Sequence, residues 1–344
     1  MRKLARPTAV LLAAVALTTV SACGGTGGST TSSDTVTVYS ADGLGDWYKT
    51  QFDAFTKQSG IKVNYVEAGS GEVVSRVEKE KSNPQADVLV TLPPFIQQAD
   101  KSGDLEASGV DTSAVDPKLK SADGEYVALA DNYFTMIRGT SLNPKPQNWT
   151  DLTGSAYKQK IQYSTPGQAG DGTALLVLVQ HIMGDDAGLK YLGDLQTNNV
   201  GPSSSTGKLG PKVSKGELAV ANSDVQMALQ SISADKSAYE TYIPEWNGTR
   251  TTLPLPYYMG LANKAPHQAN GKKLMEFLLS KDVQSSLPSG AFGAPVRTDV
   301  TPTGPNWDAF QKALTGVTVW YPDWDSISTG LDASVKAYDK VTGQ

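Results

Sequence analysis

An alternation of strand and helix patterns along residues 35–91 constrains the fold most. Residues 35–40 alternate apolar and polar side chains and are rich in β-branched types, which predicts a strand. Residues 46–59 then place their aromatic side chains on one helical face. The same order repeats, with strands expected at 62–67 and 87–90 and a helix at 72–81 between them. This β-α-β-α-β order predicts an α/β lobe built on a parallel sheet.

A second unit of the same kind begins near Asn132. Strands are expected at 133–138, 161–164 and 218–221, and the helix at 174–183 is almost wholly apolar, as in a helix buried between layers. Two α/β units in one chain predict two lobes with a ligand cleft between them. Each lobe is expected to hold a parallel-rich sheet flanked by helices.

The N-terminus carries the pattern of an exported lipoprotein. Basic residues precede a short apolar stretch at 9–17, and the sequence Val-Ser-Ala-Cys23 resembles a bacterial lipobox. Residues 24–33 are all Gly, Ser or Thr, which is typical of a flexible tether. We expect a signal peptide at 1–22, a lipidated Cys23 with its tether at 23–34, and an extracytoplasmic, membrane-anchored protein. The alternatives are an ordinary signal peptide with an incidental cysteine, or a cytosolic protein with an apolar start.

The composition excludes several function classes. A net charge of −5 over 344 residues offers no basic surface for nucleic acid. A single cysteine cannot form an internal disulfide, and two histidines cannot form a histidine-rich metal site. We therefore expect a monomer that binds no nucleic acid, metal or cofactor.

The strand-to-helix corners share one chemistry. Small hydroxyl residues and glycines leave backbone N–H groups free at a helix N-terminus, where the helix dipole favours anions. Ligands of α/β sheets bind at such corners, beyond the carboxyl ends of the strands. Each corner alone is equally typical of an ordinary helix cap, but their recurrence in both halves favours a small anionic ligand. The corners are residues 40–43, 68–72, 91–93, 164–173 and 221–224.

The sequence matches known catalytic motifs only weakly. Residues 201–208 resemble a phosphate-binding loop but contain one residue too many, and Leu209 stands where Ser or Thr should hold magnesium. His181 lies within the apolar helix and His267 in a proline-flanked loop, so both are interpreted as structural or exposed. We do not expect an enzyme.

Three segments carry a family resemblance: VTVYSADGLGDWY, VEAGSGEVVSRVEKEKSNPQADVLVTLPPFIQQA and KLMEFLLSKDVQSSL. Together with the leader and tether, they resemble the extracytoplasmic solute-binding proteins of ABC importers with the type II two-lobed fold, and among these the 2-aminoethylphosphonate-binding group. The resemblance implies lobe closure over the ligand and delivery to an ABC permease in the cytoplasmic membrane. It implies a first lobe of residues 35–131 and 256–300, and a second of residues 132–255 and 301–344.

Ferric-ion relatives offer a contrast. Their pattern places paired tyrosines shortly after a Lys-Gly-Glu run, here Lys215-Gly216-Glu217, but the residues that follow contain no tyrosine pair. A hard cation would lose its phenolate ligands. The absence of this tyrosine pair favours 2-aminoethylphosphonate as the ligand. Ferric iron, a polyamine, or another phosphonate or phosphate ester stays an alternative ligand. A tethered enzyme or a sensor subunit is the alternative class.

The expected ligand is a zwitterion with a phosphonate and an ammonium. Hydroxyl and backbone N–H donors should hold the phosphonate. A carboxylate or an aromatic face should hold the ammonium. Helix capping stays open for Asp42 and Asp224, and core packing for both tyrosines. The predicted phosphonate-binding residues are Ser70, Gly71, Glu72, Thr165, Gly170, Asp171, Gly172 and Thr173. The candidates for the ammonium are Asp42, Asp224, Tyr133 and Tyr258, and Ser40, Ala41 and Thr91 complete the predicted site.

Overall fold

The structure, a computed structural model, describes residues 34–344. The predictions for the signal peptide, Cys23 and most of the tether lie outside the described residues. Strands β1, β2 and β3 form the parallel part of a six-stranded sheet, and β12 joins β3 antiparallel and also pairs with β4 and β5. The strands of this first sheet are β1 (Thr35–Ala41), β2 (Lys62–Ala68), β3 (Val88–Thr91), β4 (Leu105–Glu106), β5 (Tyr126–Ala130) and β12 (Tyr257–Ala262).

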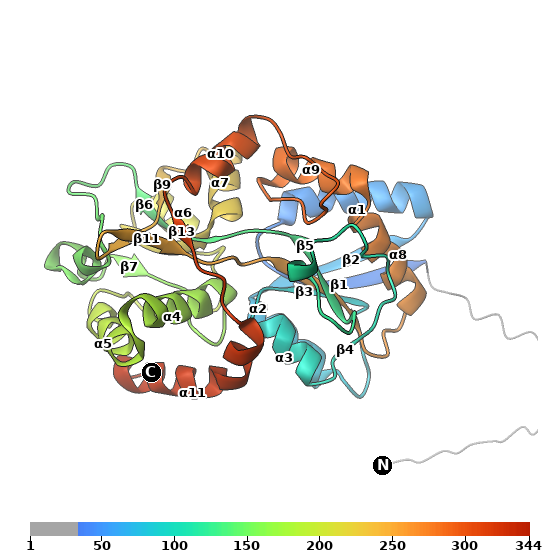
Figure 1. The fold of residues 1–344 in the computed structure, drawn as a ribbon, viewed down its shortest axis with the longest axis horizontal. Helices are drawn as coiled ribbons and strands as arrows, with labels where there is room; N and C mark the ends of the chain where they lie inside the picture. The colour runs from blue at the N-terminus through green and yellow to red at the C-terminus, as the bar shows by residue number, and fades with distance from the viewer. Residues whose placement is uncertain (1–33) are drawn as a thin grey trace, which may run out of the picture. The chain divides into compact units, whose positions relative to one another are not determined.

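Helices cover the first sheet and bring distant parts of the chain together. The aromatic face of α1 is buried as predicted, with Tyr48 and Phe52 stacked at 4.9 Å between ring centroids. In Figure 1 the orange segment that carries α8 and α9 packs beside the blue segment that carries α1 and β1. These elements form the first lobe. Its helices are α1 (Gly45–Ser59), α2 (Ser70–Lys79), α3 (Phe95–Lys101), α8 (Gln268–Leu278) and α9 (Lys281–Ala291), with a 3₁₀ turn at Pro117–Leu119.

The second lobe is built on a four-stranded sheet in the order β7-β8-β6-β9. Its strands are β6 (Phe134–Gly139), β7 (Ile161–Gln162), β8 (Val220–Asp224) and β9 (Tyr239–Tyr242). A smaller sheet of β10 (Glu245–Trp246), β11 (Thr249–Thr252) and β13 (Thr318–Val319) accompanies it. The helices are α4 (Gly170–Met183), α5 (Asp185–Gln196), α6 (Gly210–Ser214), α7 (Val225–Ala234), α10 (Pro305–Ala313) and α11 (Trp324–Thr342).

The mixed α/β class is confirmed, but the sheets contain more antiparallel pairs than predicted. In the first sheet only the β1–β2 and β1–β3 pairs are parallel. In the second sheet only β7–β8 is parallel, since β6 runs antiparallel to both of its neighbours. The expectation of parallel-rich sheets was therefore wrong. The physical reason is that the chain crosses between the sheets and returns, so β6 and β12 enter their sheets in the reverse direction.

Several predicted boundaries shift in ways that matter for the site. Helix α4 begins at Gly170 rather than near residue 174, so the glycine-rich corner forms its first turn. Strand β8 extends to Asp224, which caps α7 by accepting from the backbone N–H of Met227. Between β6 and β7 the chain forms two 3₁₀ segments, Trp149–Thr153 and Ser155–Tyr157.

The two crossover strands between the sheets lie side by side. Residues 131–133 lead from β5 to β6, and residues 253–256 lead from β11 back to β12. The backbone N–H of Leu255 donates to the carbonyl oxygen of Asn132 at 2.7 Å, and that of Phe134 donates to Leu253 at 3.0 Å. We call these paired segments the crossover strands, since they connect the first sheet with the second.

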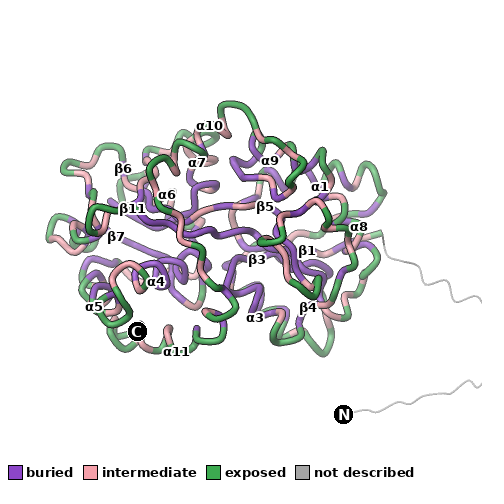
Figure 2. Tube along the Cα trace, in the orientation of Figure 1, coloured by how far each residue is buried: buried purple, intermediate pink, exposed green. Residues whose placement is uncertain are grey.

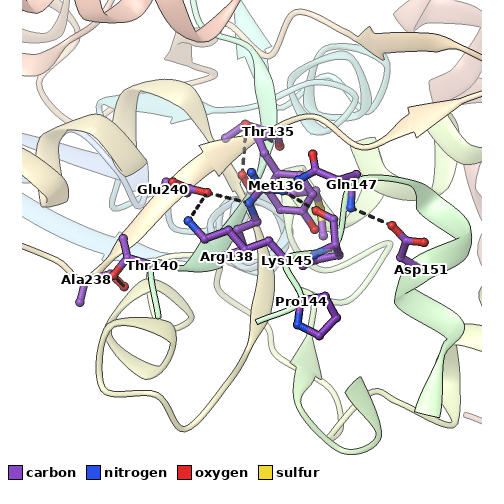
Figure 3. Close-up of polar contacts among 12 residues, drawn as sticks. Thr135, Met136, Arg138, Thr140, Pro144, Lys145, Gln147, Asp151, Ala238 and Glu240 are labelled. Atoms are coloured by element: carbon purple, nitrogen blue, oxygen red, sulfur yellow. Dashed lines mark hydrogen bonds and ion pairs between the residues drawn. The ribbon is translucent and has the colours of Figure 1, made fainter. Parts of the chain in front are cut away.

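Polar contacts fix the outer strand of the second sheet (Figure 3). The side chain of Arg138 on β6 donates to Glu240 on β9 at 2.9 Å, and Lys145 adds a second ion pair with Glu240 at 3.0 Å. The Arg138 guanidinium also lies over the ring of Tyr242, 4.4 Å from its centroid. Since each cation already has protein partners, this group holds β9 in place.

Apolar burial follows the sheets, as the purple trace in Figure 2 shows. One cluster packs on the first sheet, around residues such as Val38, Leu89 and Met259. Another packs on the second sheet, around Phe134, Leu176 and Trp149. Within residues 34–344, no helix has both the length and the apolar character needed to span a bilayer.

Candidate functional site

Three aspartates from different elements, two of them buried and one half-buried, meet between the lobes. Asp42 follows β1, Asp171 lies in the first turn of α4, and Asp224 ends β8. The side chains of Asp171 and Asp224 are almost fully buried, with 2% and 0% of their surface exposed. The charges of Asp224 and Asp42 act on Asp171. We call these three residues, together with Tyr257, the acidic site.

Asp42 joins the two lobes directly. Its Oδ2 accepts a hydrogen bond from the hydroxyl of Ser205 at 2.6 Å and one from the backbone N–H of Gly207 at 2.7 Å. Both donors belong to the loop before α6, which is part of the second lobe. Burial raises the pKa of the Asp42 carboxyl, and these two hydrogen bonds partly offset that effect. The Asp42 carboxylate therefore accepts these two hydrogen bonds only when the lobes are in contact.

Asp224 is bound by groups from both lobes. Its Oδ1 caps α7 by accepting from the backbone N–H of Met227 at 2.7 Å, and its Oδ2 accepts from the hydroxyl of Tyr257 at 3.1 Å. Burial raises the pKa of Asp224 to about 6, although the hydrogen bonds from Met227 and Tyr257 and the nearby amide of Asn132 favour the charged form. Asp224 therefore caps α7 and is also part of the acidic site.

Asp171 is the member of the site with an unused oxygen. Its Oδ2 accepts from the hydroxyl of Thr206 at 3.0 Å, while its Oδ1 is buried and lacks a hydrogen-bond partner among the described residues. Burial, then the charges of Asp224 and Asp42, raise the pKa of Asp171 well above its ordinary value. A buried acceptor without a donor is unfavourable by about 1–3 kcal/mol. The site is therefore suited to a ligand that brings a hydrogen-bond donor and positive charge.

Tyr257 closes the site from the crossover side. Its hydroxyl lies 3.1 Å from the backbone oxygen of Asp42 as well as from Asp224 Oδ2. Gly43 makes this approach possible, because a Cβ at that position would lie 1.9 Å from the Tyr257 hydroxyl. Gly43 also has φ +134°, a conformation that favours glycine.

The first turns of two helices face each other beside the acidic site. The backbone N–H of Gly71 on α2 donates to the carbonyl oxygen of Gln168, at 2.9 Å, across the lobe contact. A Cβ on Gly170 of α4 would lie 3.0 Å from the hydroxyl of Ser70. The N-termini of α2 and α4 therefore converge, and their dipoles place partial positive charge on the same region. The junction thus has two poles, the carboxylates at one and the facing N-termini of α2 and α4 at the other, and they adjoin at Asp171 in the first turn of α4.

A cavity of about 230 Å³ opens beside the acidic site. Residues of both lobes line it, and four of them are acidic: Asp42, Asp46, Glu67 and Asp235. Burial, then the charge of Asp42, raises the pKa of Glu67. The region in front of the acidic site therefore favours the approach of a cation.

Most residues predicted at the strand-to-helix corners lie where the two lobes meet. Several of them hold the backbone of that region in place through hydrogen bonds or close packing. Thr91 donates its hydroxyl to the carbonyl oxygen of Ser70, and Thr173 donates to Ala169 within the first turn of α4. Thr165 Oγ1 accepts from the backbone N–H of Ser203, and Gly172 lets α4 pack on residue 164. Glu72 lies in the first turn of α2 and is exposed.

Four predicted residues have other surroundings. Ser40 is buried in β1 and donates to the carbonyl oxygen of its neighbour Ala41, which is also buried. Tyr133 donates its hydroxyl to Asp131 at 3.2 Å and packs against Phe310. Tyr258 packs edge-on against Tyr126 in the core of the first lobe. The structure does not bring these side chains into the acidic site as defined here.

Sequence reasoning missed the loop that completes the site. Ser205, Thr206 and Gly207 all donate to its carboxylates, although the sequence of residues 201–208 resembles only an imperfect phosphate-binding loop. The usable signal is the same as at the corners, namely hydroxyl residues beside glycine. Tyr257 is a site residue that is not among those predicted from the sequence.

Two other groups do not contribute to this site. His181 stacks on Trp320 with 3.8 Å between ring centroids, and His267 contacts Asp87 at 3.1 Å. The carboxylates of Asp100, Asp123 and Glu125 lie within 4.8 Å of one another, on α3 and before β5, and are the described residues that could hold a metal ion.

Comparisons with known proteins agree with this architecture. The periplasmic thiamin-binding protein has a TM-score of 0.77 at 20% identity, with 90% of this chain and 96% of that one covered. The periplasmic binding protein AfuA from Actinobacillus pleuropneumoniae, solved with fructose-6-phosphate, has a TM-score of 0.74 at 19% identity, covering 90% and 98%. These similarities confirm the two-lobed fold of type II periplasmic binding proteins.

Sequence similarity is higher to another group. The "Putative 2-aminoethylphosphonate-binding periplasmic protein" of Salmonella typhimurium is 48% identical over 313 residues, which cover 89% of this chain and 92% of that protein. The homologue of the same name in Salmonella paratyphi A is 47% identical over the same coverage. Residues 41–285 match the family of bacterial extracellular solute-binding proteins. With its two lobes and a polar site between them, the chain belongs to that family.

Proposed function

We propose that this protein captures 2-aminoethylphosphonate between its lobes and delivers it to an ABC permease. The proposal is supported by the name of the Salmonella typhimurium relative and by the chemistry of the junction. The observation that carries it is the buried, unpartnered Oδ1 of Asp171 beside Asp42 and Asp224. A primary ammonium supplies both the donor and the positive charge that this oxygen lacks.

The two ends of the ligand match the two poles of the junction. In our proposal the ammonium binds Asp171, Asp224 and Asp42, so Asp171 changes from the phosphonate end, where the sequence pattern had put it, to the ammonium end. The phosphonate binds at the first turns of α2 and α4, where Ser70 and Gly170 face each other. Helix N-termini favour anions through unpaired N–H groups and the dipole. Two carbon atoms separate the ammonium from the phosphonate in this ligand, and in our proposal each end binds one of these adjoining poles.

Closure follows from the same contacts. Asp42 accepts its donors from Ser205 and Gly207 of the second lobe, so the acidic site is complete only when the lobes meet. A ligand that binds both lobes therefore stabilises the closed form. The crossover strands at 131–133 and 253–256 are where the chain would bend. In the proposed cycle, the permease recognises this closed form.

Calorimetry with a ligand pair tests the assignment. Purified protein is titrated with 2-aminoethylphosphonate and with ethylphosphonate, which has the same anion and carbon chain but no amine. We expect the amine to strengthen binding by about 30-fold or more, because loss of a buried charge partner typically costs 2–5 kcal/mol. Tighter binding of ferric ion or putrescine would overturn the assignment. ³¹P spectra of the bound ligand should stay unchanged over hours, since we propose binding without turnover.

We also propose that the protein is a lipoprotein anchored through Cys23, as the lipobox-like sequence indicates. Cys23→Ser should release the protein from membranes and leave its ligand affinity unchanged, because the site lies in residues 34–344. Retention of the variant in the membrane fraction at the wild-type level would contradict the anchor. In this proposal the protein acts as a monomer outside the cytoplasm.

A further inference from the structure

The side chain of Asn132 connects the crossover strands to the acidic site. Asn132 is fully buried, and its backbone oxygen accepts from Leu255 at 2.7 Å in the crossover pair. Its side-chain Oδ1 accepts from the backbone N–H of Gln226 at 3.1 Å, in the first turn of α7. Asp224 is the cap of the same helix. One residue therefore contacts both a crossover strand and the helix start that carries a site carboxylate.

The other end of this amide is the unusual feature. The Nδ2 of Asn132 is buried and has no hydrogen-bond partner of acceptable geometry within residues 34–344. It lies near Asp224, where it adds to the interactions that favour the carboxylate form. The buried amide of Asn198 offers a contrast, because its Nδ2 donates to the carbonyl oxygens of Leu152 and Gly154 at 2.8 and 2.9 Å. Asn132 therefore places a buried, unpaired N–H donor beside a carboxylate at a crossover strand, which points to a role in the site as well as in packing.

We propose that Asn132 is a positioning residue that keeps the Asp224 carboxylate oriented for the ligand's ammonium, and thereby links amine recognition to the geometry of the crossover. This inference rests on the proposed function. The hydrogen bond from Gln226 fixes the orientation of the amide, because it requires Oδ1 on the side of α7 and so directs Nδ2 away from it. When the crossover strands turn, the amide moves with them and the carboxylate loses a neighbouring donor. Asp224 is then a weaker partner for a cation in the open form than in the closed form.

The test measures selectivity rather than affinity alone. Affinities for 2-aminoethylphosphonate and ethylphosphonate are compared in wild type, Asn132→Ala and the control Asn198→Ala, which removes a buried amide remote from the site. We expect Asn132→Ala to reduce the preference for the amine about tenfold while ethylphosphonate affinity is unchanged. Asn198→Ala should reduce thermal stability and leave the preference at the wild-type value. An unchanged preference in Asn132→Ala would overturn the proposal.

A double variant separates this proposal from the proposed function. If Asn132 acts through Asp224, the effect of Asn132→Ala should disappear in an Asp224→Asn background. If wild type itself shows no preference for the amine, the proposed function fails. A third outcome is that wild type prefers the amine, Asp224→Asn loses this preference and Asn132→Ala keeps it. In that case the proposed function stands and only the role of Asn132 fails.

Asn132→Asp covers the case in which the alanine variant does not fold. This variant keeps the acceptor for Gln226 and replaces the donor with a second carboxyl oxygen beside Asp224. Like charges raise carboxyl pKa values, and Asp42 and Asp171 already act in the same direction. The preference for the amine should therefore be lost on acidification at a higher pH in Asn132→Asp than in wild type. Coincident pH profiles would contradict the proposal.

Discussion

The hydroxyl of Tyr257 lies 3.1 Å from a carboxylate oxygen of Asp224, although the two residues belong to different sheets. Tyr257 begins β12 of the first sheet, and Asp224 ends β8 of the second. The contact therefore exists only while the lobes are together. It also adds a donor to a buried carboxylate that, in our proposal, must stay charged to bind an ammonium.

Replacing Tyr257 with Phe should weaken binding of 2-aminoethylphosphonate by about tenfold or more. A hydrogen bond to a charged group contributes about 1.5–3 kcal/mol. Tyr258→Phe is the matched control, because its ring packs on Tyr126 in the core and not at the acidic site. Calorimetry should show normal affinity for the control. Equal losses in both variants would place the effect in the core of β12 instead.

The choice between these neighbouring tyrosines shows where sequence reasoning ends. Adjacent residues of a strand point to opposite faces, so one of the pair faces the core and the other the junction. Because both residues are tyrosines, the amino-acid sequence does not say which of them faces the junction. The register of β12 against β3, in which Tyr258 pairs with Thr91, decides it, and that register depends on long-range packing.

The aspartates were more predictable because local chemistry determines their place. Asp42 and Asp224 each follow a predicted strand and precede a helix, and such corners meet at one edge of a sheet. Their convergence with Asp171 required the second lobe to face the first, which no local pattern specifies. The loop of Ser205 and Gly207 lay outside any predicted strand-to-helix corner, so its role followed only from its contacts with Asp42.

Amine recognition should depend on pH through Asp224. Burial raises the pKa of this carboxyl to about 6, above its ordinary value of 3.8. Below about pH 6 the carboxyl takes up a proton and no longer attracts an ammonium, so affinity should fall as the pH falls. Calorimetry from pH 5 to pH 8 tests this, with ethylphosphonate as the control for titration of the phosphonate itself. A preference for the amine that is constant over this range would contradict the assignment of Asp224.

Ser205 should control how long the closed form lasts. Its hydroxyl donates to Asp42 at 2.6 Å across the lobe contact, a charge-assisted hydrogen bond. Ser205→Ala should speed ligand release about tenfold, because the closed form loses this contact while the open form does not. Stopped-flow dissociation measures the rate. Ser285→Ala, which removes only a hydrogen bond within α9, should release ligand at the wild-type rate.

Glu125 should make thermal stability depend on pH. The hydrogen bond with Asp100, then burial and the charges of Asp100, Asp123 and Glu106, raise the pKa of Glu125 to about 7. The folded state therefore holds this proton at a pH where the unfolded state releases it, and stability falls as the pH rises from about 4.5 to 7. Glu125→Gln should melt at a higher temperature than wild type at pH 8 and at the same temperature near pH 4.5. The exposed Glu276→Gln serves as control, and a Glu125→Gln Tm equal to wild type at pH 8 would contradict the prediction.

Gly69 provides the sharpest test of lobe closure. It precedes α2 with φ −67° and ψ 152°, a conformation that alanine also adopts. An added Cβ would lie 2.1 Å from the backbone oxygen of Ser204 and 3.6 Å from that of Gln168, and the three nearest atoms all belong to the second lobe. Backbone atoms cannot move aside cheaply, so Gly69→Ala should hinder closure without crowding the first lobe. We expect affinity for 2-aminoethylphosphonate to fall about 30-fold or more, with little change in the Tm of the ligand-free protein.

Small-angle scattering with and without ligand measures the closure that Gly69→Ala should prevent. Wild type should become more compact on adding 2-aminoethylphosphonate, and the variant should not. Gly330→Ala is the matched control, since a Cβ at that position of α11 meets no atom within 4 Å. Its affinity and compaction should equal those of wild type. If Gly69→Ala closes and binds normally, the contact between α2 and the Ser204 loop is not part of the ligand-bound form, and the phosphonate pole must be sought away from that helix start.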